Sequence, residues 1–382
     1  LVLMIVFVVL AQRVRPQMIM FIFFAAANAF AYAVAIGQHM EHDFLNLRYN
    51  IASNQYTKFI STFGNINMYA SYLSISIPVL LAVFAFCKNW FSRILSGILL
   101  IAAGCNILIA NSDSVFLGIF AGVVVVTILA FMQGRLRYSS FAVFLLFVGN
   151  LVLGFINKYG HTRYDKKRGG LAIALNRLDI AFVLCGAALL VFAVVCVCNW
   201  KLGTRVAAWN KKKIVLIVCG ACVALGVIGI IVLAVTGSSL LTFNDKWGSY
   251  RGYIWRKIVE VYGDAPFVNK LFGYGNESVR VTLKAACYNE MVQVTGKVYD
   301  NAHNELLQYL FTTGIVGLLS YLALVGSSIV YMFKHAKEHA WISVCLAATV
   351  GYFAQSILNL NQPITTPLFF VSVSYTHLTL PT

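Results

Sequence analysis

Two basic side chains of different chemistry, Arg251 and His303, lie near opposite ends of a long polar interval, residues 237–305. A fixed arginine can stabilise negative charge that develops on a leaving group. A histidine, with an ordinary pKa of about 6.5, can accept a proton at neutral pH. Asp300 and Glu305 are weaker candidates for the base, or for orienting the imidazole. We expect Arg251 and His303 to serve one step of a group transfer if the interval folds back over its own ends.

The sequence around these two residues predicts the elements that hold them. Apolar residues recur at helical spacing through 249–262, which predicts a short amphipathic helix with Arg251 and Trp255 one turn apart. His303 and Asn304 come directly before the next apolar run and are predicted to cap its helix. The alternative is purely structural: His303 only caps the helix, and Arg251 pairs with an acid such as Asp245.

The composition excludes a soluble globular protein. Hydrophobic residues make up 60% of the 382 residues and charged residues only 11%, against roughly 25% charged in soluble proteins. The net charge of +16 does not indicate nucleic-acid binding, because most of the excess lies in short loops between apolar runs. Most of the nine cysteines are inside those runs, so we expect neither a disulfide framework nor a zinc or redox site.

Apolar runs of membrane-spanning length predict an all-α polytopic membrane protein with about eleven transmembrane helices. We expect the first and last to be incomplete. About eight spans fall in 1–236, one large external loop with short helices occupies 237–305, further spans occupy 306–371, and 372–382 is expected to be a non-native tail. The spans are predicted at 1–11, 18–38, 69–87, 94–110, 114–132, 141–156, 180–198, 214–236, 306–333, 341–358 and from 367 onward.

The charge distribution predicts which loops face the cytoplasm. If the spans alternate, one set of short loops holds 13 of the 29 lysines and arginines but only Glu338 of the 13 acidic residues. Dense basic charge in short loops marks the cytoplasmic side. The loop 237–305 belongs to the other set, so it is predicted to be extracytoplasmic.

Two further groups are candidate substrate ligands. Arg163, Lys166, Lys167 and Arg168 are four cations within six residues on the predicted outer side, where they contact anionic lipid headgroups or hold a specific phosphate. Asn65 and Asn67 precede a span, where they form a helix-entry turn or bind sugar hydroxyls.

A polar tetrapeptide, Asn111 to Ser114, is predicted to be a hairpin turn with Ser or Asp capping the next helix. Within 237–305 there is no Asp-x-Asp pair and no metal-ligand spacing of His and Glu. We therefore expect no metal and no cofactor, and we expect metal chelation to leave activity intact.

Taken together, the motifs resemble the O-antigen ligase and O-antigen polymerase superfamily of bacterial envelope glycosyltransferases. The resemblance covers roughly residues 55 to 335. One departure is Ser112-Asp113, where many relatives carry Ser-Arg. The segments that carry the resemblance are 62–70, 111–118, Arg251-Gly252-Tyr253-Ile254-Trp255, Leu271-Phe272-Gly273-Tyr274-Gly275, 302–308 and 314–318.

The resemblance implies a helical bundle in a bacterial cytoplasmic membrane, with its active loop extracytoplasmic. It implies metal-free transfer or polymerisation of a glycan from a polyprenyl pyrophosphate donor to a glycan or lipid acceptor, as in surface or capsular polysaccharide assembly. The family's functional Arg and His fall on Arg251 and His303. Trp255 is a candidate to pack along the sugar or prenyl stem, and Asn304 a candidate substrate ligand.

Two alternatives stay open at the level of sequence. A transporter or flippase of lipid-linked sugars or small anions would carry an internal repeat and polar, broken spans, which the chain does not clearly show. Within the transferases, a repeat-unit polymerase, a ligase and a protein O-glycosyltransferase are not separated by the sequence.

Overall fold

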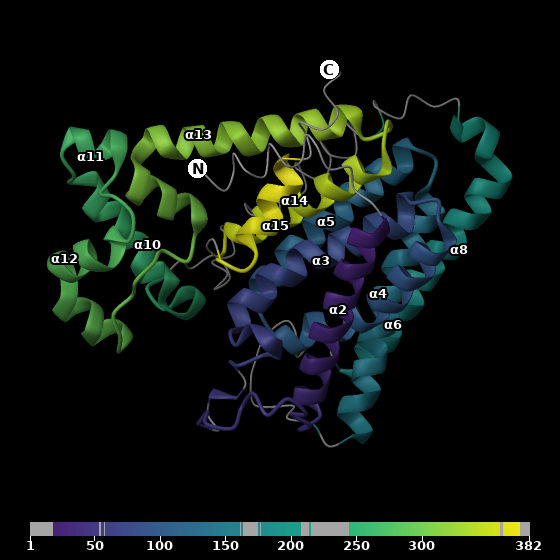
Figure 1. Cartoon of the computed structure of the whole chain (residues 1–382), viewed down its shortest axis with the longest axis horizontal. Helices are drawn as coiled ribbons and strands as arrows, with labels where there is room; N and C mark the ends of the chain where they lie inside the picture. Colours follow the sequence, from purple (N-terminus) through teal and green to yellow (C-terminus); the bar gives the residue numbers. More distant parts are fainter. Residues whose placement is uncertain are drawn as a thin grey trace, which may run out of the picture. The chain divides into compact units, whose positions relative to one another are not determined.

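The computed structural model describes residues 18–52, 55–56, 58–160, 162, 175, 177–207, 214, 244–359 and 362–374. Within these ranges the chain forms twelve α-helices and one short 3-10 helix, and no β-strand (Figure 1). The chain divides into two compact units. Unit 1 comprises 1–209, 327–355 and 362–382, and unit 2 comprises 210–326 and 356–361.

Seven of the described helices are long and apolar enough to cross a membrane, so the expected all-α polytopic class is confirmed at that level. The predicted span 1–11 and the predicted span 214–236, except for residue 214, lie outside the described residues, and the total of eleven stays a prediction. The seven are α2 (Met18–His39), α3 (Ile66–Phe86), α4 (Trp90–Ala110), α5 (Asp113–Met132), α6 (Leu136–Tyr159), α8 (Leu178–Ala207) and α13 (Glu305–His335). The later apolar segments are α14 (Ala340–Ser356) and α15 (Thr366–Ser374), both shorter.

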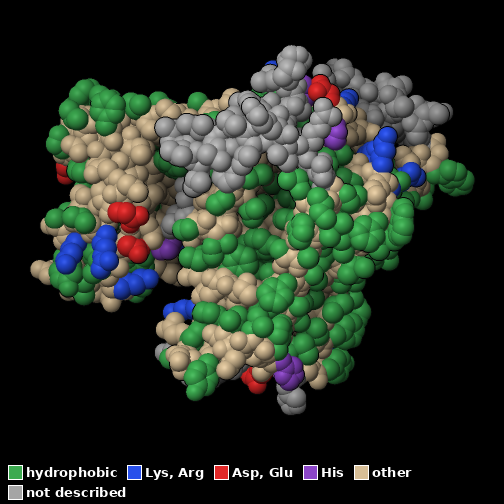
Figure 2. Space-filling model, in the orientation of Figure 1, with side chains coloured by type: hydrophobic (Ala, Val, Ile, Leu, Met, Phe, Trp, Pro, Cys, Tyr) green, Lys and Arg blue, Asp and Glu red, His purple; other side chains and the backbone are tan. Residues whose placement is uncertain are grey.

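Unit 1 is organised around α3. The most apolar window of α3 is 94% buried, whereas that of α8 is only 6% buried. Helix α3 packs against α4, α5 and α6. Because α8 is apolar and open on most of its surface, its side chains are suited to face lipid. Figure 2 shows hydrophobic side chains gathered over the helices of this unit.

Small residues let the helices of unit 1 approach closely. Helices α4 and α6 cross at Gly104 and Gly149, where an added Cβ would lie 2.1 Å from Leu146 O and 2.0 Å from Ile101 O, respectively. Neither position has room for a side chain. Close backbone approach at small residues is a main source of helix association in membranes, where burial from water gives no driving force.

Buried polar side chains of α3 find partners on neighbouring helices. The Tyr69 hydroxyl donates to Asn106 Oδ1 at 2.6 Å, and the Tyr32 and Ser76 hydroxyls lie 2.9 Å apart. Ser71 Oγ donates to Gln355 Oε1 at 3.2 Å. These pairs satisfy groups that would be costly to leave alone in a low-dielectric bundle.

Unit 2 contains the described part of the polar interval and α13 as far as Gly326. It is built from α10 (Trp247–Gly263), α11 (Phe267–Phe272) and α12 (Ser278–Thr295), followed by α13. The predicted helix 249–262 corresponds to α10, although Ser249 and Tyr250 have left-handed backbone angles, so regular helix begins after them. The core of this unit consists of Tyr253, Ile254, Ile258, Val279, Leu283, Met291, Tyr299, Ala302 and Phe311.

Helix α13 is not one straight span. At Gly314 the backbone has φ 68° and ψ −172°, which breaks the helix. The rings of Tyr309 and Tyr321 then stack at 4.3 Å, and the Tyr321 hydroxyl donates to Glu305 Oε1 at 2.8 Å. In a straight helix, residues 305 and 321 would be about 24 Å apart. The predicted continuous span 306–333 is therefore corrected: its first turns fold back on the rest.

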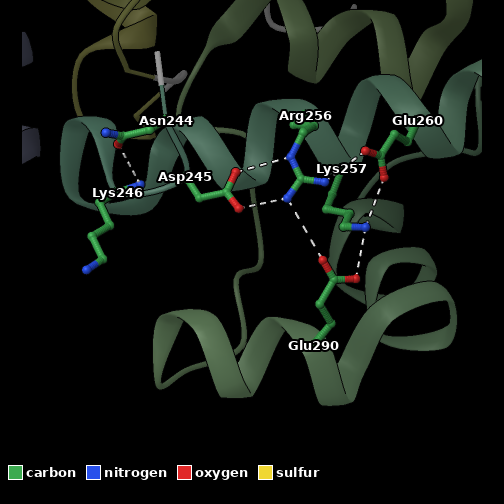
Figure 3. Close-up of polar contacts among 7 residues, drawn as sticks. All are labelled: Asn244, Asp245, Lys246, Arg256, Lys257, Glu260 and Glu290. Carbon is green, nitrogen blue, oxygen red and sulfur yellow. Dashed lines mark hydrogen bonds and ion pairs between the residues drawn. The ribbon is translucent and has the colours of Figure 1, made fainter. Parts of the chain in front are cut away.

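An ion network joins α10 to α12 (Figure 3). Arg256 makes two hydrogen bonds to Asp245, at 3.1 and 2.8 Å, and a third to Glu260 at 2.9 Å. Lys257 Nζ lies 2.9 Å from both Glu260 and Glu290. These carboxylates, Asp245 first, raise the pKa of Arg256 above its usual value. The network links the two helices and pairs Arg256 and Lys257, two of the three cations on α10, with carboxylates.

Candidate functional site

The backbone before His303 is held from three directions. The indole Nε1–H of Trp255 donates to Ala302 O at 2.8 Å, and the Ala302 N–H donates to Gln308 Oε1 at 2.9 Å. The His303 N–H donates to Asn301 Oδ1 at 3.2 Å. With these bonds in place His303 has φ 48°, a left-handed conformation that costs a non-glycine residue on the order of 1 kcal/mol. Such strain persists only where the surroundings determine the conformation.

The imidazole of His303 lies in an enclosed environment. Its ring meets the Tyr299 ring edge-on at 6.0 Å, and its Nδ1 is buried without a hydrogen-bond partner among the described residues. Burial, then the positive charges of Arg251 and Lys297, lower the pKa of His303 to about 4, while Asp300 opposes the shift. At neutral pH the ring is therefore uncharged, with a free lone pair, and it is a weaker base than an ordinary histidine.

Arg251 lies near the same two rings. Its charge lowers the pKa of His303 and also acts against the burial that raises the pKa of Tyr299. The Tyr299 hydroxyl donates to Ser249 O at 2.8 Å, which ties the segment before His303 to the start of α10. The charge of Arg251 therefore acts on the imidazole of His303, and a shared step of the two residues stays a prediction.

The predicted alternative partner of Arg251 is engaged elsewhere. Both oxygens of Asp245 are bound by Arg256, not by Arg251. Arg256 and Lys257 are in turn surrounded by carboxylates, as described above. Of the three cations on α10, Arg251 is the one that the structure associates with His303.

The residues flanking His303 have structural contacts. Asn304 Oδ1 accepts the Leu307 N–H at 3.0 Å and caps α13, as predicted for this position. Glu305 is 1% exposed and bound to Tyr321, so it lies inside the fold-back of α13. Asp300 is exposed and accepts a bond from the Asn301 amide. The predicted substrate role of Asn304 stays a prediction.

The other predicted motifs lie in unit 1. Asn65 caps α3, because its Oδ1 accepts the Asn67 N–H at 2.7 Å, in agreement with a helix-entry turn. Ser112 is the first residue before α5, but its side chain makes no capping bond; its hydroxyl instead lies 3.0 Å from that of Ser114. Nothing in these contacts tests the sugar-binding role predicted for Asn65 and Asn67.

The predicted phosphate-binding cations Arg163, Lys166, Lys167 and Arg168 lie outside the described residues. At the edge of that loop, Arg177 forms an exposed ion pair with Asp179 at 2.8 Å. The binding role of the four cations therefore stays a prediction.

No three His, Cys, Asp or Glu side chains are grouped to hold a metal ion in the described part of the chain. The site around His303 is built instead from a neutral imidazole, a guanidinium and aromatic rings. The metal-independence of the reaction stays a prediction.

Comparison with known protein families identifies the interval that holds this site. Residues 168–322 match the family described as O-antigen ligase. The matched interval covers 155 of the 382 residues. The match includes Arg251, Trp255 and His303 and extends through the fold-back of α13. The chain thus combines seven apolar helices of membrane-spanning length with an interval similar to an O-antigen ligase domain. No curated protein matches the chain.

The hydrogen bonds of Trp255 and Gln308 to the Ala302 backbone, which we call the clamp, allow a test that separates positioning of His303 from substrate binding. Gln308→Leu leaves the buried Ala302 N–H without an acceptor, at a cost of about 1–3 kcal/mol. For a reaction in which His303 takes part, we expect kcat to fall about tenfold with the substrate KM unchanged, because His303 is no longer held. Gln308→Glu keeps an acceptor oxygen at the same place and should retain most of the rate.

Trp255→Phe tests the other side of the clamp, because phenylalanine keeps an aromatic ring but loses the donor to Ala302 O. If Trp255 positions His303, this variant should resemble Gln308→Leu. A raised KM with unchanged kcat would instead support the predicted packing of the ring on substrate.

Proposed function

We propose that this protein transfers a glycan from a polyprenyl pyrophosphate carrier to an acceptor hydroxyl at the outer face of a bacterial cytoplasmic membrane. The family match supports a role in glycan assembly. The observation that carries the proposal is the neutral, strained and enclosed His303 beside Arg251. Perturbed pKa values and backbone strain are typical of functional sites.

The proposed step balances as a substitution at the anomeric carbon. The acceptor oxygen forms the new bond to that carbon while the bond to the carrier pyrophosphate breaks. His303 takes the proton of the acceptor hydroxyl, and the polyprenyl pyrophosphate leaves as the anion. Arg251 stabilises the negative charge that develops on this leaving group. Burial is the main cause that lowers the pKa of His303 before the acceptor arrives, and the charge of Arg251 adds to it.

The proposal assigns different roles to the cations on α10. Arg256 and Lys257 are bound by carboxylates, which suits a structural role. Phosphate recognition needs a guanidinium placed toward the reacting groups, and Arg251 is placed beside His303. The extracytoplasmic location of this interval is part of the proposal, carried by the charge asymmetry of the loops.

The test is a transfer assay with the full protein in liposomes and a polyprenyl pyrophosphate-linked oligosaccharide. The proposal requires release of free polyprenyl pyrophosphate together with an extended or newly attached glycan. Movement of intact donor across the bilayer without cleavage would instead identify a flippase. Chain-length analysis after gene deletion then separates the two transferase readings: loss of long chains indicates a polymerase, and unattached long chains indicate a ligase.

A further inference from the structure

Helix α11 presents an unusual amount of apolar surface for a short helix in a polar interval. Phe267, Val268 and Phe272 are 73%, 65% and 62% exposed, respectively. No residue of α11 is buried. Exposing apolar area to water costs roughly 25 cal/mol per Å², so two open aromatic rings and a valine favour a non-aqueous environment. Figure 2 shows hydrophobic side chains gathered over α11.

The end of α11 is bonded to the break in α13. The Tyr274 N–H donates to Phe311 O and the Gly275 N–H to Thr312 O, both at 2.9 Å. A Cβ on Gly273 or Gly314 would lie 2.3 or 2.2 Å from the opposing backbone, so the two segments touch directly. These bonds satisfy carbonyls that the break deprives of their helical partners. The position of α11 relative to α13 within unit 2 is therefore fixed.

The length of α13 places this junction at a membrane boundary. After the break, Ile315–His335 spans about 21 residues, or roughly 31 Å. The hydrocarbon core of a bilayer is about 30 Å thick. The segment after Gly314 is long enough to cross by itself, so the fold-back and α11 lie where it enters the bilayer.

The apolar surface continues from the span onto α11. Ile315, Val316 and Leu319, directly after the break, are 37%, 45% and 57% exposed in a helix suited to cross a membrane. Gly314, the residue directly before them, lies against the Leu271–Phe272 backbone of α11. A lipid-facing surface and the exposed side chains of α11 therefore belong to adjacent segments.

We propose that α11 is an interfacial anchor that inserts Phe267, Val268 and Phe272 into the acyl-headgroup boundary of the leaflet where α13 begins to cross. Aromatic and aliphatic side chains on a short helix favour this depth. The anchor fixes the height of unit 2 above the bilayer. The inference rests on α13 spanning the membrane and does not depend on the transfer reaction.

The test is site-specific photocrosslinking in the full protein, reconstituted in phosphatidylethanolamine and phosphatidylglycerol vesicles. A p-benzoylphenylalanine residue is introduced at Val268, at Phe272 or, as a matched control, at Val281 of α12, which is 70% exposed. Phospholipid adducts, identified by mass spectrometry of the modified peptide, should be several-fold more abundant at positions 268 and 272 than at 281. Because both Val268 and Phe272 are tested, the experiment remains informative if one of the two variants folds poorly.

Equal adduct yields at the three positions would overturn the anchor. Crosslinks from position 268 to a second copy of the chain, in place of lipid, would also overturn it. A His303→Ala background should give the same crosslinks as the unchanged protein, because the anchor needs no turnover. Failure of the transfer proposal is therefore distinguishable from failure of the anchor.

Discussion

His303→Ala should lower the rate of glycan transfer by roughly a hundred- to ten-thousandfold, the range typical of a lost general base. The ring is neutral at pH 7 and its Nδ1 is enclosed without a hydrogen-bond partner among the residues that the structure describes, which suits proton transfer better than charge pairing. Donor binding should change little, because His303 is proposed to contact the hydroxyl of the acceptor substrate and not the donor. The measurement is single-turnover transfer and donor affinity in liposomes.

The control for this variant is its folding. The capping bond of α13 comes from Asn304 and the clamp from Trp255 and Gln308, so removing the imidazole leaves those contacts in place. Expression and thermal stability should therefore resemble those of the unchanged protein. A well-folded His303→Ala protein that still transfers glycan at a near-normal rate would end the assignment of His303 as the base.

Arg251→Ala should lower the rate about a hundredfold, which corresponds to roughly 3 kcal/mol of lost charge stabilisation in the transition state. Arg251→Lys keeps the charge but lacks the bidentate fork for a phosphate, so it should recover only part of the rate. Arg256→Gln is the matched control on the same helix: its guanidinium binds Asp245 and Glu260, and its loss should affect stability more than turnover. Equal rate losses at 251 and 256 would contradict a specific role for Arg251.

The charge of Arg251 should also affect how the transfer rate depends on pH. The pKa of His303 is lowered to about 4, so the unchanged protein should keep the base neutral down to about that pH. Removing the positive charge of Arg251 raises this pKa toward 6.5, and the acid limb of the rate profile moves to higher pH. The move is partial, because burial is the larger cause. Arg251→Lys, which keeps the charge, should leave the limb in place.

Local features of the site were predictable from the sequence because they depend on neighbours along the chain. The helical spacing of apolar residues placed α10 to within a few residues. The amide side chains of Asn65 and Asn304 were expected at helix starts, where capping bonds are made within three residues. The all-helical membrane class followed from composition and run length alone.

The features that position His303 depend on contacts between distant segments. Gln308 looks like an ordinary polar residue in the first turns of a helix, and only the fold shows that its oxygen holds Ala302. Gly314 falls inside the span 306–333, which was predicted to be continuous. In the structure α13 breaks at Gly314, which lies against the backbone of α11. No local sequence pattern predicts this contact. The preceding carbonyls then bind Tyr274 and Gly275.

Residues with left-handed backbone angles were a second source of difference between the predicted and the observed helix α10. Ser249 and Tyr250 were read as helical because their spacing fits, but their φ values of 60° and 72° place them before the regular helix. The carbonyl of Ser249 is thereby available to the Tyr299 hydroxyl, at 2.8 Å. A tertiary hydrogen bond thus accompanies a departure from the local helical preference.

The most direct test of the account is a double-mutant cycle on Arg251 and His303, measured as single-turnover transfer at pH 7. If the two residues serve one chemical step, their effects are strongly non-additive. We expect the Arg251→Ala/His303→Ala protein to be only a few-fold slower than the slower single variant. Losses that multiply across the two positions would show that Arg251 and His303 act independently and would contradict the single proposed step.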